Sequence, residues 1–218
     1  MGYLEAYGFN VNPYDPCVAN KMIGGKQLTV FWHANNLKIS CIDANEVTKM
    51  IQWLESEYGE MHGSRGKRHD YLEMWLDYSI PGELRIYMEE YLRGVLDYFL
   101  EEITETPETP AASNLFTVRD DSDRDLPDET RAQSFHHAVA KLLFTGIRCT
   151  QDAQTAIYFP TTRVRKADVD DWKKLRRLLG YLKRTIKLPL ILRADGVTVL
   201  KWWVDTSYAA NDNIRGHT

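Results

Sequence analysis

The sequence lacks the features that would direct a protein into a membrane or through a secretory pathway. No apolar run reaches the roughly 18 residues that a membrane-spanning helix needs. Residues 1–6 contain neither a basic region nor the long apolar stretch of a secretory signal. Position 6 is Ala, so the Ser or Thr of an N-myristoylation motif is absent. We therefore expect no membrane partner.

Cysteine is also scarce. The three cysteines, Cys17, Cys41 and Cys149, lie far apart and lack the spacing of a metal site. Because three is an odd number, a complete disulfide framework is excluded. We interpret the cysteines as reduced and mostly buried in an intracellular protein, with no distinction between cytoplasm and nucleus.

The net charge is small, but the charges are unevenly distributed. The total is −4 at pH 7, which argues weakly against a nucleic-acid partner. Residues 101–129 contain ten acidic and two basic side chains, whereas residues 141–187 contain twelve basic and four acidic ones. This asymmetry predicts an exposed acidic linker followed by a basic helical region that contacts a phosphate backbone. The alternative is two solvated surfaces with no partner.

The first part of the chain alternates between β-forming and turn-forming residues. Strands are predicted over about 17–22, 27–33 and 37–42. The turns between them contain Gly24-Gly25 and Ala34-Asn35-Asn36, because Gly and Asn tolerate positive φ. Further along, the pattern predicts a helix from Asp43 to Tyr58, a hairpin over 69–78 and 83–87, and an amphipathic helix over 89–100.

The second part of the chain is mainly helical in pattern. Residues 104–128 contain three prolines and many acids, which indicates a linker. Helices are predicted over about 130–148, 151–162 and 169–184, followed by strands over 188–193 and 198–204. The fold class is therefore α+β: an antiparallel sheet with a helix on one face, then a helical bundle and a C-terminal β-hairpin.

Several segments, in the same order, resemble copia-type retrotransposon reverse transcriptases. Residues 14–18, Tyr-Asp-Pro-Cys-Val, resemble the family's D-P-C-V/L-Y stretch. Residues 28–40 resemble its catalytic hairpin, in which the family has a V-D-D turn. The further similar segments are 71–74 (Y-L-G-M before the primer grip), 138–143 and 152–156 (thumb helices), and 202–209 (the D-A/S-x-Y/W-A first strand of ribonuclease H).

The resemblance implies a division into four segments. These are a partial palm (1–100), an acidic linker (101–129), a helical thumb or connection (130–187) and the truncated start of a ribonuclease H-like domain (188–218). In such a polypeptide the fingers and early palm would precede this chain, and most of ribonuclease H would follow it. The family is an RNA-directed DNA polymerase that uses Mg²⁺.

Asn35 and Asn36 stand where the resemblance places two metal-binding aspartates. Mg²⁺ prefers anionic oxygen, and Asn offers only a neutral carbonyl. A pair of unit charges 4 Å apart interacts by about 4 kcal/mol at an effective dielectric of 20, and a divalent ion roughly doubles this. We therefore expect no cofactor and no polymerase activity. From the residues alone the two asparagines form a hairpin turn, which is compatible with that expectation.

The resemblance also assigns Asp205 to the first carboxylate of ribonuclease H. That site needs several acids, and only Asp212 follows, so we expect no nuclease; the alternative is a polar residue at a strand end. Asp168, Asp170 and Asp171 are predicted to favour a helix macrodipole rather than to bind metal. Basic residues of the 169–184 helix are candidates for phosphate contacts, with a solvated helix face as the alternative. They are Lys173, Lys174, Arg176, Arg177, Lys183 and Arg184.

Three functional hypotheses follow. The first is an inactive retroelement fragment with weak affinity for an RNA/DNA duplex. The second is a domesticated module that binds nucleic acid or protein. The third is an active polymerase whose missing acids come from another chain. A palm without its first half exposes a sheet edge, which predicts self-association or a protein partner that covers this edge.

Overall fold

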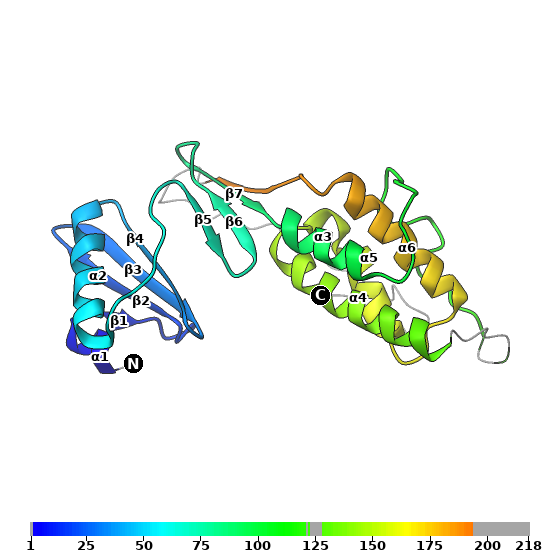
Figure 1. The fold of residues 1–218 in the computed structure, drawn as a ribbon, viewed down its shortest axis with the longest axis horizontal. Coiled ribbons are helices and arrows are strands. Elements are labelled where there is room, and N and C mark those ends of the chain that lie inside the picture. Colours follow the sequence, from blue (N-terminus) through cyan, green and yellow to red (C-terminus); the bar gives the residue numbers. More distant parts are fainter. Residues whose placement is uncertain (1, 121, 123–127, 194–218) are drawn as a thin grey trace. The chain divides into compact units, whose positions relative to one another are not determined.

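A computed structural model describes residues 2–120, 122 and 128–193. The chain forms two compact units, Met1–Leu72 and Glu73–Thr218. Antiparallel strands and helices occur in the described parts of both units, which confirms the predicted α+β class (Figure 1). Within those parts, no helix is both long enough and apolar enough to cross a lipid bilayer.

The boundary between the units falls at residue 72, whereas the sequence predicted a boundary near residue 100. The reason is the position of helix α3 (Glu89–Tyr98). Its buried Leu92 and Val95 belong to the same apolar cluster as residues of the later helices, so α3 belongs to the second unit. The assignment of palm, thumb and ribonuclease H segments stays a prediction.

A four-stranded antiparallel sheet dominates the first unit. Its strands, in the order β1-β2-β3-β4, are β1 (Asn10–Val11), β2 (Val18–Ile23), β3 (Lys26–His33) and β4 (Asn36–Cys41). The bounds of the last three lie within one residue of the predicted ones. The short helix α1 (Gly2–Ala6) precedes the sheet, and β5 (Arg68–Tyr71) ends the unit.

Helix α2 (Ala44–Tyr58) covers one face of this sheet (Figure 1). Asp43 caps the helix as predicted, because its carboxylate accepts a hydrogen bond from the backbone N–H of Asn45 at 3.0 Å. Leu28 and Val30 of β3 are buried against Met50 and Leu54 of α2 in one apolar cluster. Burial of this kind contributes about 25 cal/mol per Å² of apolar surface. The face of the sheet that contacts α2 is therefore part of the core. The residues next to these along each strand point to the opposite face.

The helices of the second unit confirm the predicted pattern. They are α3, α4 (Glu129–Arg148), α5 (Gln154–Arg163), which follows the 3₁₀ turn η2 (Gln151–Ala153), and α6 (Val169–Arg184). Their inward side chains form a single apolar cluster that includes Phe135, Leu142, Ile157 and Leu175. Phe135 and Leu142 lie seven residues apart on α4, so helical periodicity places both on the face that packs into this cluster.

The second unit also contains a three-stranded antiparallel arrangement. Strands β6 (Met74–Asp77), β7 (Glu83–Tyr87) and β8 (Leu190–Arg193) pair in that order, with Ile86 opposite Leu190. The sequence predicted instead that the 188–193 strand pairs with a strand over 198–204. That second strand and Asp205 lie outside the described residues, so the terminal hairpin stays a prediction.

The predicted linker is mostly exposed in its described part, residues 101–120, but two of its apolar side chains pack into the helical core. Ile103 and Leu115 are buried, at 6% and 8% exposure, and both belong to the apolar cluster of the helices. Composition suggested a linker because acids and prolines outnumber large apolar residues. Two apolar anchors twelve residues apart are nevertheless enough to hold the segment against the bundle.

Candidate nucleic-acid interface

The β3–β4 hairpin holds the two asparagines that the sequence predicted at the degenerate metal positions. His33 pairs with Asn36, so the turn consists of Ala34 and Asn35 alone. The positive φ occurs at Ala34 (φ 50°), not at an asparagine, which corrects the expectation that an Asn takes the left-handed conformation here. The physical reason is the register, which makes Asn36 the first paired residue of β4.

These residues do not fit a magnesium ion. Asn35 and Asn36 offer neutral carbonyl oxygens, and their cross-strand neighbour His33 offers a ring nitrogen, whereas Mg²⁺ selects anionic oxygen. Across the described parts of the chain, no group of three or more His, Cys, Asp or Glu side chains is arranged to hold a metal. No catalytic step through a metal is therefore derived for this hairpin.

The face of the sheet opposite α2 carries its own hydrogen-bond network of polar side chains. The pairing places Asn20 beside Thr29 and Thr29 beside Ser40 on this face. Gln27 Nε2 donates to Asn20 Oδ1 and to Thr29 Oγ1, both at 2.9 Å, and Thr29 Oγ1 donates to Asn20 Oδ1 at 2.8 Å. We call this side the open face, defined by Asn20, Gln27, Thr29, Phe31, His33, Lys38 and Ser40.

Two aromatic rings and a cation lie on the open face. Phe31 contacts Tyr71 of β5 edge to face, with ring centroids 5.3 Å apart. Lys38 Nζ lies 5.1 Å from the centre of the Phe31 ring and donates to Ser40 Oγ at 3.0 Å. Burial raises the pKa of the Tyr71 phenol above its ordinary value, which already lies well above neutral pH, so the protonated group can donate a hydrogen bond. Rings, amides and a cation on one sheet face are the chemistry that binds a single nucleic-acid strand.

Helix α6 begins at the aspartate cluster, as predicted. Asp168 is the N-cap and accepts hydrogen bonds from the backbone N–H groups of Asp170 and Asp171, at 2.8 and 3.0 Å. The Asp171 carboxylate in turn accepts from the Asp168 N–H and from Arg163 Nε, at 3.2 and 2.9 Å. This reciprocal arrangement is a capping box, so these acids have a structural role.

The basic side chains of α6 differ in their hydrogen-bond and ion-pair partners. Lys173 is exposed and pairs with Asp170 at 3.1 Å. The other five predicted phosphate contacts all reach residues 101–119, which we call the α6 cover: four donate hydrogen bonds to it, and Arg176 forms an ion pair with it. Lys174 Nζ donates to the Thr117 carbonyl at 2.6 Å and Arg177 Nη2 to Thr109 Oγ1 at 2.8 Å. The α6 cover therefore competes with any phosphate for these side chains.

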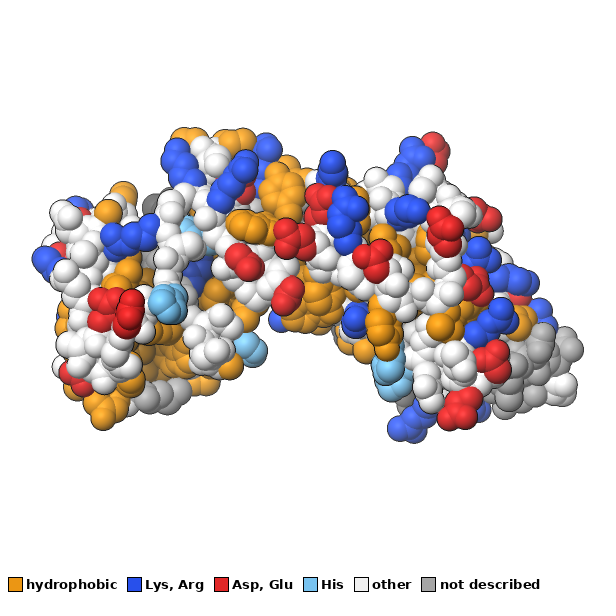
Figure 2. Space-filling model, viewed as in Figure 1, with side chains coloured by type: hydrophobic (Ala, Val, Ile, Leu, Met, Phe, Trp, Pro, Cys, Tyr) orange, Lys and Arg blue, Asp and Glu red, His pale blue; other side chains and the backbone are white. Residues whose placement is uncertain are grey.

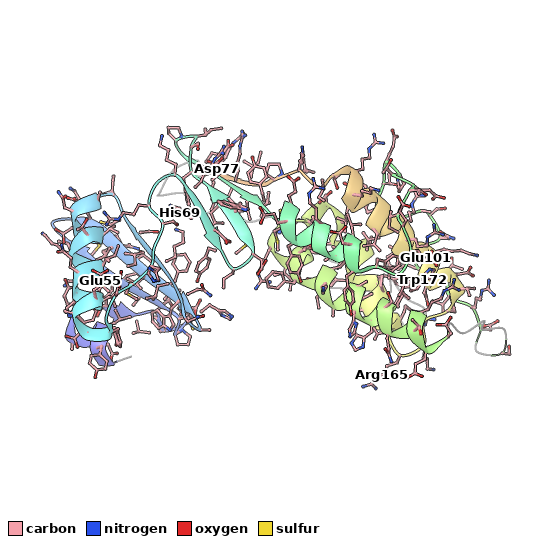
Figure 3. The ribbon with its side chains drawn as sticks, viewed as in Figure 1. Glu55, His69, Asp77, Glu101, Arg165 and Trp172 are labelled. Atoms are coloured by element: carbon pink, nitrogen blue, oxygen red, sulfur yellow. The ribbon has the colours of Figure 1, made fainter. Side chains whose placement is uncertain are left out.

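The remaining three cations contact the first half of the α6 cover. Lys183 Nζ donates to the Ile103 carbonyl at 2.6 Å. Arg184 reaches the Thr106 carbonyl and the Glu108 carboxylate, both at 3.4 Å. Arg176 Nε pairs with Glu101 at 3.1 Å. Glu101 also accepts from the indole N–H of Trp172 at 3.1 Å, and Figure 3 shows these two side chains next to each other.

The comparisons with known proteins add no assignment. No family model, curated protein or solved structure matches this chain. The resemblance to copia-type reverse transcriptases therefore stays an interpretation of the sequence.

The sequence analysis missed Phe31, Tyr71 and Lys38 as site residues. The alternating pattern of residues 27–33 predicts a strand whose side chains point to two faces in turn. That alternation was the signal that could have placed Phe31 on the face opposite the core. The contact between Phe31 and Tyr71 joins residues 40 positions apart and had no signal in local pattern.

Proposed function

We propose that this chain is a non-catalytic relative of copia-type reverse transcriptases that binds single-stranded nucleic acid through the open face. One observation carries the proposal: the open face has the Phe31–Tyr71 pair and Lys38 at its centre, and neutral amides at its hairpin end. Bases can stack on the aromatic rings of this face, and its lysine attracts phosphate. None of the residues that define the face is a carboxylate that could bind a catalytic metal ion.

The absence of polymerase activity is a prediction of this proposal. With an RNA template, a DNA primer, deoxynucleotides and Mg²⁺ or Mn²⁺, we expect no primer extension above a protein-free control. The reason is that the hairpin lacks anionic oxygen for two metal ions. Sustained, template-dependent extension by the purified chain would overturn this part of the proposal and would favour acids supplied by a second chain.

Binding to the open face is tested by Phe31→Ala. Stacking of one base on an aromatic ring contributes about 1–3 kcal/mol, so we expect Phe31→Ala to weaken binding of fluorescein-labelled oligo(dT) by about five- to a hundredfold. Lys38→Ala is expected to reduce the slope of log affinity against log salt by about 0.7, because one phosphate contact is lost. The measurement is fluorescence anisotropy over a salt series.

A matched control comes from the same hairpin. Leu37 is exposed and pairs with Trp32, so it lies on the face opposite to Phe31. Leu37→Ala should leave the affinity for oligo(dT) unchanged. Equal effects of Phe31→Ala and Leu37→Ala, or no binding by the unmodified protein, would contradict the assignment of the open face.

A further inference from the structure

The contacts between α6 and the α6 cover have an unusual composition. Of the five cations that contact this segment, three donate to backbone carbonyls (Ile103, Thr106 and Thr117) and one donates to the Thr109 hydroxyl. Carboxylates are involved only through Glu101 and Glu108. The Glu108 side chain is 84% exposed, so its pairing with Arg184 is weak. Three of the five cations also have a carboxylate nearby, because Lys174 pairs with Asp171 at 3.4 Å, Arg176 with Glu101 and Arg184 with Glu108. Arg177 and Lys183 instead donate to neutral acceptors of the α6 cover.

A phosphate would be a stronger acceptor for the same donors. These cationic donors already make charge-assisted bonds to neutral acceptors, and an anionic phosphate would add attraction between opposite charges. Guanidinium groups also bind phosphate in a bidentate fork. Arg177 Nε is buried and has no hydrogen-bond partner among the residues that the structure describes. An anion that replaced Thr109 at Arg177 would use this idle donor together with Nη2.

The α6 cover is fixed at its ends and weakly held between them. Ile103 and Leu115 are buried in the apolar cluster. Most side chains between them are exposed, including Glu105, Thr106 and Thr109. Figure 2 shows acidic and basic side chains interspersed on the visible surface of this unit. Between the anchors Ala111 packs against the apolar cluster, but most other residues are exposed, so few apolar contacts oppose release of residues 104–114 from the helix.

Gly180 shows how closely the α6 cover approaches the helix. A Cβ atom at this position would lie 2.3 Å from the Glu105 carbonyl oxygen and 2.9 Å from Pro107 Cδ. Both distances are shorter than a van der Waals contact, and the nearer atom belongs to the backbone. Only glycine permits the backbone of the cover to lie on α6, although glycine costs about 1 kcal/mol in a helix interior.

We propose that the basic side of α6 is a second nucleic-acid-binding surface, specific for the phosphate backbone of a duplex, and that the α6 cover is an intramolecular competitor that keeps it closed. This inference rests on the proposed function only for the choice of nucleic acid as ligand. The duplex binds when residues 104–114 leave the helix, and then contacts Lys174, Arg176, Arg177, Lys183 and Arg184.

The test is Gly180→Ala, which forces the cover away from the helix without changing any charge. Gly94→Ala is the matched control, because Gly94 is also in a helix and a Cβ there would meet nothing within 4 Å. For a fluorescein-labelled 20-base-pair DNA duplex in low salt, we expect at least tenfold tighter binding by Gly180→Ala than by Gly94→Ala. The slope of log affinity against log salt should steepen by at least 2 and by up to about 4.5, the value for five phosphate contacts.

Hydrogen exchange shows whether the cover has moved. Amides of residues 104–114 should exchange faster in Gly180→Ala than in Gly94→Ala. Unchanged exchange would overturn the inference, because the helix surface would then accommodate a methyl group under the cover. Faster exchange with a smaller gain in affinity or slope than expected would also overturn it, because the uncovered surface would not bind the duplex.

Two further variants keep the test independent of folding and of the open face. If Gly180→Ala fails to fold, replacement of residues 104–114 by a Gly/Ser segment of equal length, with both anchors retained, must give the same gain. Adding Phe31→Ala must leave the ratio between Gly180→Ala and Gly94→Ala unchanged. If the unmodified protein does not bind oligo(dT) but the duplex gain persists, the open-face proposal alone is removed. If oligo(dT) binds as expected but the duplex gain is absent, only the inference about α6 is removed.

Discussion

Asp171→Ala is expected to lower the free energy of unfolding by about 3 kcal/mol. Asp171 is 2% exposed, and its carboxylate holds the Arg163 guanidinium and the Asp168 N–H at the start of α6. The Arg163 side chain is only 12% exposed, so the substitution leaves a largely buried cation. This cation then keeps the Asp168 carboxylate at 3.7 Å and the Lys166 carbonyl at 3.2 Å as partners. Removing one member of a buried ion pair typically costs 3–5 kcal/mol, and Asp168 offsets part of this. Urea denaturation followed by circular dichroism measures the change.

Asp170→Ala is the matched control for this prediction. Asp170 is on the same helical turn and pairs with Arg119 and Lys173, but its side chain is 36% exposed. Surface pairs contribute about 0–1 kcal/mol, so the expected loss is under about 1 kcal/mol. Similar losses for the two variants would contradict the role assigned to burial at Asp171.

The contribution of Asp170 to the stability of the fold depends on pH in a defined direction. A hydrogen bond from Arg119, followed by one from Lys173, lowers the pKa of Asp170 to about 2 from its ordinary 3.8. A carboxylate with a lowered pKa stabilises the fold above its unfolded pKa and loses that contribution as pH falls through its folded pKa. The difference in stability between the unmodified protein and Asp170→Ala should therefore shrink between about pH 4 and pH 2.

Leu175→Ala is expected to cost about 2–5 kcal/mol. Leu175 is fully buried, at 0% exposure, in the apolar cluster that joins the helices of the second unit. Shortening the side chain removes apolar contacts and leaves a cavity that a close-packed core fills only in part. The same urea experiment gives the loss, with an unchanged denaturant slope if the unfolded state is unaffected.

Leu100→Ala is the control for the core. Leu100 is a leucine of the same unit with 51% of its surface exposed, so its replacement should change stability by less than about 0.5 kcal/mol. If Leu175→Ala were as mild as Leu100→Ala, the cluster would have to repack without a cavity, and its described packing would be wrong.

Local pattern determined most elements of this protein. The alternation in residues 27–33 and the Gly and Asn turns predicted the strands of the first sheet, because side chains of a strand point to its two faces in turn. Asp43 predicted the start of α2 as a capping residue, because a carboxylate satisfies backbone N–H groups that a helix start leaves unpaired. Asp168, Asp170 and Asp171 predicted the start of α6, because negative charge favours the N-terminal end of the helix dipole. The neutral character of Asn35 and Asn36 also follows from the sequence alone.

Tertiary structure decided which surfaces are available. The acids and prolines of residues 101–120 predicted an exposed linker, yet Ile103 and Leu115 bury themselves in the helical core and bring this segment onto α6. The basic residues of α6 were found by their spacing, but their partners lie 57 to 80 positions away along the chain for Lys174, Arg177, Lys183 and Arg184. Spacing along a helix shows which side chains share a face, whereas long-range burial decides what covers that face.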